Sequence, residues 1–294
     1  MMPWPAAAKN AVKTGKKKAV AAWYKNVRAL LNKNDRPSIA RGCRVAAVPT
    51  KALRKHTRAT INLMRRMVGV KTIKLKPLFN KRAQQAALIT TLNGLNHDPD
   101  KSALCWTKMG KTGAGNSNLS LGSVGAGAVT GYMDDSSNVQ GANVGHRSWL
   151  IDPFTRYMGV GQVDASGYGW GGGAIYVVNP KSATKNPNPQ WLRWPTAGFF
   201  PKAMEPSGLW SFMTAQPGYD LSKAKATIKK GTKALKLATL YDSGHGGQSG
   251  IIMQVRVPRT RTYQAKAGAY SVTITGIRYR GVKQSPVTYK VKLF

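Results

Sequence analysis

The sequence predicts an α+β fold, with helices and short strands in its first two thirds and an all-β part at its end. Apolar residues recur every three or four positions in three segments before residue 96, a spacing typical of helices that pack against a core. From about residue 218 apolar and polar residues alternate, which is typical of half-buried strands. A Pro- and Trp-rich stretch separates the two patterns, so we expect a helical part followed by a β module.

Two helices are expected before residue 70. Residues 19–31 fit an amphipathic helix, and residues 51–68 fit a second one, with Thr50 as its N-cap and Gly69 as its end. His56 lies off the apolar stripe of the second helix, which favours a position on the surface. The apolar positions of the two helices are Val20, Trp23, Tyr24, Val27, Leu30 and Leu31, then Leu53, Thr57, Ile61, Met64 and Val68.

The middle of the chain is expected to carry further helices and one strand pair. A helix over 80–95 would begin at Asn80 and end at Gly94, and His97 follows on the next loop. Residues 107–127 are rich in Gly, Ser and Asn, so we expect a loop there with a short ordered core, SNLSLG. The other elements expected before residue 180 are a helix beginning within 127–136, a short helix after His146, and hairpin strands at 156–161 and 174–178.

These patterns divide the chain into four parts. Residues 1–45 form a basic N-terminal arm, and residues 46–180 form one domain. Residues 181–217 are the Pro/Trp-rich segment, which is expected to wrap and close a domain. Residues 218–294 contain five alternating strands separated by Gly, Ser and Pro turns, a pattern that indicates a small β-sandwich.

The charge of the chain is strongly positive. It holds 46 Lys and Arg against 10 Asp and Glu, a formal net charge of +36. Such a surface attracts polyanions, so the candidate partners are nucleic acid, an anionic lipid surface and an anionic cell-wall polymer. The alternative is an adaptation of solubility or habitat that serves no single partner.

No apolar run approaches the length of a transmembrane helix. The first residues lack the apolar core of a signal peptide, so no intact signal is visible. Three explanations stay open: numbering that begins after processing, another export route, or a protein that remains inside. Two cysteines, Cys43 and Cys105, can form one disulfide, which is weak support for an oxidising compartment.

Two histidines stand beside expected helix ends, with an acidic pair between them in sequence. If the helices pack over the strands, His97 and His146 converge across one cleft, with Asp135 within reach. Two imidazoles and a carboxylate suit a zinc-type ion with open coordination positions. They also suit acid–base chemistry near neutral pH. For each histidine alone a capping role is simpler, so the pair is what favours a site.

Four separated motifs resemble the bacterial branch of the CAP superfamily, which holds the cysteine-rich secretory proteins, antigen 5 and plant pathogenesis-related proteins. They are the run from Asn93 to His97, SNLSLG, GYMDD and GHRSWLIDPFTRYMGVG, in the family's order over roughly residues 50–180. RWPTAGFFP, GLWSF, YSVTITGI and TYKVKLF resemble the region after the domain in long secreted actinobacterial members. The resemblance implies a CAP-type α-β-α sandwich followed by a small all-β, Ig-like sandwich.

The resemblance also implies a cleft with two histidines and two acids. His97 and His146 occupy the histidine places, and Asp135 falls near one acidic place. Ser117 stands where the family's Gly-Glu-Asn motif has its Glu, while Asn118 keeps the Asn. Because serine does not ionise near neutral pH, one potential base is lost. Any zinc would be held weakly, by two imidazoles, at most one carboxylate, and water.

Arg147 follows His146 as in bacterial relatives, and it shares with Asn118 a candidate role in ligand binding. It either orients an acidic ligand or Asp135, or it pairs with a nearby carboxylate and fixes the cleft wall; we prefer the second interpretation. Among the cysteines, Cys105 matches one found in long bacterial relatives. A Cys43–Cys105 disulfide that pins the arm to the cleft loop is therefore expected, as is an extracellular or cell-surface location.

Three functions are carried forward. The first is a secreted or surface-associated CAP-domain binding protein without catalysis, whose cationic exterior associates with an anionic polymer or envelope. The second is a metal-assisted hydrolase that uses His97, His146 and Asp135 with a bound water as nucleophile. The third is a nucleic-acid-associated structural or assembly protein whose arm neutralises phosphates. We prefer the first because Ser117 replaces an acid. The sequence specifies neither the ligand nor an oligomeric state.

Overall fold

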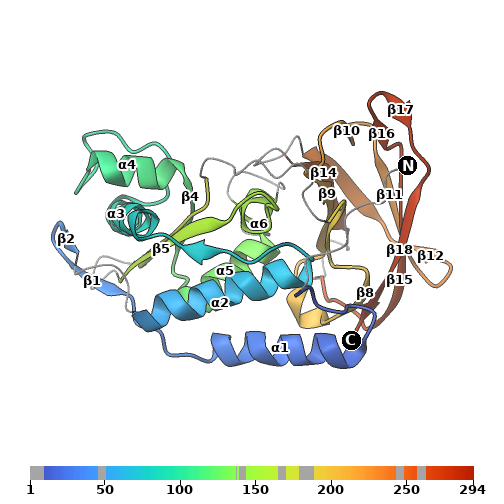
Figure 1. Ribbon diagram of the computed structural model, residues 1–294, viewed down its shortest axis with the longest axis horizontal. Helices are drawn as coiled ribbons and strands as arrows, with labels where there is room; N and C mark the ends of the chain where they lie inside the picture. Colours follow the sequence, from blue (N-terminus) through green and yellow to red (C-terminus); the bar gives the residue numbers. More distant parts are fainter. Residues whose placement is uncertain are drawn as a thin grey trace.

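The computed structural model describes residues 10–45, 51–136, 138, 144–164, 170–178, 189–242, 248–256 and 263–294 (Figure 1). The predicted α+β class is confirmed, since helices and several β-sheets are both present. Helices dominate the N-terminal part and strands dominate the part after residue 189. No helix of the described residues is long and apolar enough to span a bilayer.

One six-stranded sheet forms the centre of the N-terminal part. Its path runs β2-β1-β5-β6-β4, and β3 pairs with β5. The strands are β1 (Ser38–Arg41), β2 (Arg44–Val45), β3 (Lys74–Leu75), β4 (Ser117–Leu121), β5 (Tyr157–Asp164) and β6 (Gly172–Tyr176). The antiparallel pairing of β5 with β6 confirms the strand pair expected at 156–161 and 174–178.

Helices cover both faces of this sheet, as Figure 1 shows. They are α1 (Lys17–Leu31), α2 (Lys51–Met67), α3 (Pro77–Asn93), α4 (Lys108–Gly115), α5 (Gly125–Asp134) and α6 (Gly145–Leu150). On β6, Ala174 and Tyr176 belong to the same apolar cluster as Ala83 of α3, whereas Ile175 belongs to the cluster that contains Val129 of α5. Successive side chains of a strand point to opposite faces, so α3 and α5 lie on opposite sides of the sheet.

The first two helices fall where their apolar periodicity predicts. On α1, Val20, Trp23 and Val27 are buried, and the Trp23 indole Nε1 donates a hydrogen bond to the Leu63 carbonyl of α2 at 2.8 Å. The N-cap predicted at Thr50 lies outside the described residues. These two amphipathic helices therefore share one apolar seam.

Two expectations about the next helices are wrong. The third helix begins at Pro77, not at Asn80, because proline fits the first turn, where its missing N–H has no intrahelical partner. The buried Asn80 side chain instead accepts a hydrogen bond from the Val160 amide of β5 at 2.9 Å. The segment predicted as a loop contains α4, whose first turn is capped by Thr107.

The glycines that suggested a loop are what allow α4 to pack closely. A Cβ placed on Gly113 would lie 2.1 Å from the Arg82 carbonyl oxygen of α3. A Cβ placed on Gly110 would lie 2.5 Å from the Ile89 side chain. Any larger residue at these two positions would push α4 away from α3. The glycines of this segment therefore serve the packing of α4 on α3 and do not indicate a loop.

Two sheets and a small ribbon form the C-terminal part. The five-stranded sheet has the order β12-β11-β15-β18-β8, and the four-stranded sheet has the order β13-β14-β9-β7. Their strands are β7 (Leu192–Trp194), β8 (Gly198–Phe200), β9 (Leu209–Thr214), β11 (Lys225–Lys230), β12 (Lys233–Ala234), β13 (Leu237–Asp242), β14 (Ser249–Val255), β15 (Gly268–Thr275) and β18 (Val287–Leu293). The ribbon pairs β10 (Tyr219–Asp220), β16 (Arg278–Tyr279) and β17 (Val282–Lys283).

Aromatic side chains join the two larger sheets face to face. Trp210 of β9 meets Tyr270 of β15 with ring centroids 5.7 Å apart, and Phe212 meets Tyr289 at 6.2 Å. The 181–217 segment, expected to wrap a domain, contributes β7, β8 and β9 to these sheets. Trp194, Phe200, Trp210 and Phe212 of this segment are therefore core residues of the C-terminal part.

Candidate functional site

A cavity of about 610 Å³ opens beside β4 and α5, and both candidate histidines line it. A second cavity of about 240 Å³ is also lined by both, together with Ser117 and Asn118. His97 and His146 therefore share the walls of two adjacent cavities, although they are far apart in sequence. The structure brings together the residues that the sequence singled out.

His97 is oriented by a backbone carbonyl. It lies on the loop after α3, and its Nδ1 is 2.9 Å from the carbonyl oxygen of Ala114 in α4. A carbonyl oxygen only accepts hydrogen bonds, so His97 Nδ1 carries the hydrogen. In the neutral ring the lone pair then lies on Nε2.

His146 is oriented by a carboxylate. It stands in the first turn of α6, and its Nδ1 lies 2.8 Å from Oδ1 of Asp135. Asp135 follows α5 in the left-handed region, with φ of 58°, and its side chain is fully buried. Its other oxygen accepts the Arg147 backbone N–H at 3.2 Å. Asp135 therefore fixes the tautomer of His146. Carboxylates that accept a hydrogen bond from catalytic and metal-binding histidines have the same effect.

The neighbouring polar side chains are engaged in hydrogen bonds within the protein. Ser117 Oγ donates to the Gly113 carbonyl at 2.6 Å, and the Asn118 amide donates to the His146 carbonyl at 2.9 Å. The Tyr132 hydroxyl donates to the Asn118 carbonyl, and its ring lies against His146 at 4.8 Å. Burial raises the pKa of Tyr132 well above its ordinary value. Ser117 thus acts as a structural hydrogen-bond donor.

Arg147 is buried and forms the wall behind His146. Its guanidinium donates to the carbonyls of Met133 at 2.6 Å and Asp134 at 2.8 Å, and to the Ser211 hydroxyl at 3.0 Å. Desolvation lowers its pKa to about 10, against the opposing effect of nearby carboxylates. We expected Arg147 to pair with a carboxylate, but its hydrogen-bond acceptors are two backbone carbonyls and a hydroxyl. With a hydrogen bond from each of its three nitrogens, the guanidinium holds the cleft wall to β9.

The donor set of a zinc site is not assembled among the described residues. No three His, Cys, Asp or Glu side chains lie close enough there to hold a metal ion together. Zinc sites in proteins use at least three protein ligands, and here Asp135 already bonds His146 and the Arg147 amide. The described residues of the cavity therefore do not fit a zinc ion.

A second histidine–aspartate pair was missed by sequence reasoning. His56 was expected on the surface, but its Nδ1 lies 2.7 Å from Oδ1 of Asp35, and their side chains are 20% and 7% exposed. The two residues are 21 positions apart, so no local pattern reveals the contact. The available signal was that Asp35 is the only acid before residue 83.

A buried acid behind the cleft wall was also missed. Glu205 is buried, and it accepts a hydrogen bond from the Tyr263 hydroxyl at 2.6 Å. Burial raises its pKa to about 7, although the Tyr263 bond and the Arg147 charge act in the opposite direction. Nearby, Ser207 donates to Asp134 at 2.5 Å. This cluster couples the end of α5 to the C-terminal sheets.

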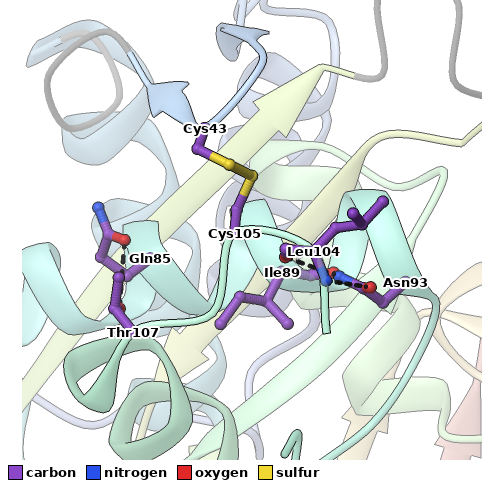
Figure 2. Close-up of a disulfide and its surroundings, with 7 residues drawn as sticks. All are labelled: Cys43, Gln85, Ile89, Asn93, Leu104, Cys105 and Thr107. Carbon is purple, nitrogen blue, oxygen red and sulfur yellow. Dashed lines mark hydrogen bonds between the residues drawn. A yellow bond between two sulfur atoms is a disulfide. The ribbon is translucent and has the colours of Figure 1, made fainter. Parts of the chain in front are cut away.

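The predicted Cys43–Cys105 disulfide is present, with Cα atoms 5.0 Å apart (Figure 2). It ties the turn between β1 and β2 to the loop that follows His97. Asn93 fastens the same loop, since its amide accepts from the Leu104 N–H at 2.8 Å and donates to the Leu104 carbonyl at 3.1 Å. The loop that carries His97 is therefore held covalently and by hydrogen bonds.

Comparison with known proteins adds no relative to this description. No protein-family model matches the chain, and no curated protein matches it at a significant level.

Proposed function

We propose that this chain is a secreted or surface-associated binding protein of the bacterial CAP type, without catalysis, whose cationic exterior associates with an anionic polymer or envelope. The observation that carries the proposal is the shared cavity of His97 and His146, built from four motifs in the family's order. The central sheet with helices on both faces is consistent with it.

The absence of catalysis is inferred from the bonding at the cavity. Ser117 replaces the family's acid and is turned into α4, and Asp135 is engaged by His146 and the Arg147 amide. Neither residue offers the cavity a base in addition to the two imidazoles, and the described residues supply no third metal ligand. The remaining cavity is a place to bind a ligand.

The polyanion part of the proposal is tested with long-chain polyphosphate. We expect the full chain to bind it, with an affinity that falls steeply as sodium chloride is raised, because binding releases condensed counterions. The His97→Ala, His146→Ala double variant is the matched control and should bind like the wild type, since its cavity is not the cationic surface. Affinity that stays constant between low and physiological salt contradicts the proposal.

A further inference from the structure

The outer face of the five-stranded C-terminal sheet carries an ordered array of lysines. Residues opposite one another across strands share a face, and the register places Lys229 opposite Ser271, and Ser271 opposite Lys290. The neighbouring row contains Thr227, Thr273 and Thr288. The lysines of this face are Lys225, Lys229, Lys290 and Lys292, and all four are exposed. We call these four residues the sheet lysines.

The opposite face of the same strands is fully occupied. Ile228, Val272 and Val291 are completely buried there, and Tyr270 and Tyr289 contact the rings of the four-stranded sheet. Figure 1 shows β11, β15 and β18 at the side of the molecule away from α2 to α6. The sheet lysines therefore point outward from a rigid, two-layered support.

Aromatic rings extend the array at the β8 edge. Phe199 lies opposite Lys292, whose Nζ stands 5.0 Å from the Phe199 ring centre. Phe294 lies 6.2 Å from Phe199, and Lys17 of α1 stands 5.1 Å from the Phe294 ring. Both phenylalanines are partly exposed. Aromatic rings flanked by lysines are typical of protein surfaces that enter the headgroup region of a membrane.

We infer that this sheet face docks on a bilayer rich in anionic lipid. The inference rests on the proposed function, because it names the site and the source of the anionic partner. Neighbouring strands lie about 4.8 Å apart, so Lys229 and Lys290 stand about 10 Å apart in one plane. Serine and threonine hydroxyls between them donate hydrogen bonds to headgroup phosphates.

The shape of the face favours a bilayer over nucleic acid. The sheet lysines lie on β11 and β18, on either side of β15, so all of them reach a planar surface at once. A duplex is a cylinder and would meet only one row of them. On the described part of this face the rings lie at the edge, not between the lysines where bases would stack.

The test uses the full chain and sedimentation with vesicles of phosphatidylcholine alone or mixed with phosphatidylserine. The wild type should bind only the mixed vesicles. Replacing the four sheet lysines by glutamine should weaken that binding by about two to three orders of magnitude, because each lysine contributes a factor of about five and the factors multiply. A matched variant, Lys51→Gln, Lys55→Gln, Lys81→Gln and Lys101→Gln, removes the same charge from exposed positions elsewhere. It should lose less than tenfold.

Each result has a distinct meaning. Equal losses in the two variants overturn the inference, since the effect would then follow net charge alone. A wild type that ignores mixed vesicles but binds a DNA duplex through the sheet lysines also overturns it and makes nucleic acid the occupant. A wild type that binds polyphosphate but no vesicle overturns the inference and leaves the proposed function standing. If the wild type binds neither polyphosphate, DNA nor vesicles, both the inference and the polyanion part of the proposed function are wrong.

Discussion

Two arginines of the helical part and the lysines of the C-terminal sheet hold positive charge in opposite environments. Arg65 and Arg147 are almost completely buried in the helical part. Arg65 donates to the carbonyls of Lys71 at 2.7 Å, Leu150 at 2.7 Å and Thr155 at 3.0 Å, and desolvation lowers its pKa to about 9. The sheet lysines stand in solvent instead. The two arginines act as internal tethers, whereas the sheet lysines are displayed to solvent.

The difference shows that net charge does not by itself identify a binding surface. A guanidinium is planar and has five donors in a fixed arrangement, so it is buried where several carbonyls converge. A lysine ammonium is strongly hydrated and stays outside. Only the second kind of cation is available to a polyanion, so substitutions in the two regions should have separable effects.

The largest effect is expected at Arg147. Alanine there leaves the carbonyls of Met133 and Asp134 without their donor, which should lower the free energy of unfolding by about 3–5 kcal/mol. Urea unfolding measures it. Arg147→Lys should recover only part of the loss, because one ammonium cannot reach all three acceptors. A loss below about 1 kcal/mol would mean that the wall relaxes, and the contrast with the sheet would weaken.

Glu205 provides the next effect, through pH. Its pKa is about 7 in the folded chain against an ordinary 4.5, so the folded state favours the protonated form. This contribution to stability is complete below pH 4.5 and is lost as pH rises through 7. Glu205→Gln should remove the decline and raise the free energy of unfolding at pH 8 by about 3 kcal/mol.

The control for Glu205 is Asp98→Asn, since Asp98 is 83% exposed. Chemical unfolding at a series of pH values between 4 and 8 compares the two variants with the wild type. Parallel pH profiles for the wild type and Glu205→Gln would show that the buried carboxyl does not set the pH dependence.

The smallest effect is expected from the sheet lysines. Replacing all four by glutamine should change the free energy of unfolding by less than about 0.5 kcal/mol per site, because exposed side chains contribute little to stability. Thermal and urea unfolding check it. A large loss would show that these side chains pack against something in the folded chain, and that they are not simply displayed.

Local sequence patterns predicted the elements that depend on local physics. Amphipathic periodicity located α1 and α2, and alternation located β15 and β18. The start of α3 was missed although Pro77 is a local signal for it, because Asn80 resembles a cap but serves β5 instead. The existence of α4 was missed because its glycines fit a partner elsewhere. Asn80 bonds β5, 80 positions away, and Gly113 makes room for the backbone of α3.

The residues of the candidate site also differ in whether sequence reasoning could find them. Sequence reasoning located His97 and His146 from their places beside expected helix ends, and both line the same cavities. It did not locate the Asp35–His56 pair or Glu205, because their contacts join distant segments: Glu205 and Tyr263 are 58 positions apart. Nor did it show that Ser117 is turned into α4, since the direction of a side chain depends on its packing.

The Cys43–Cys105 bond makes a closed ring of the chain between these residues, and α2 and α3 lie within that ring. A protease that cuts any one peptide bond of the ring cannot release a fragment. The nicked molecule keeps its mass on a non-reducing gel and separates into two bands only after reduction. A single cut inside this ring therefore leaves α2, α3 and the loop that carries His97 covalently attached to the rest of the chain.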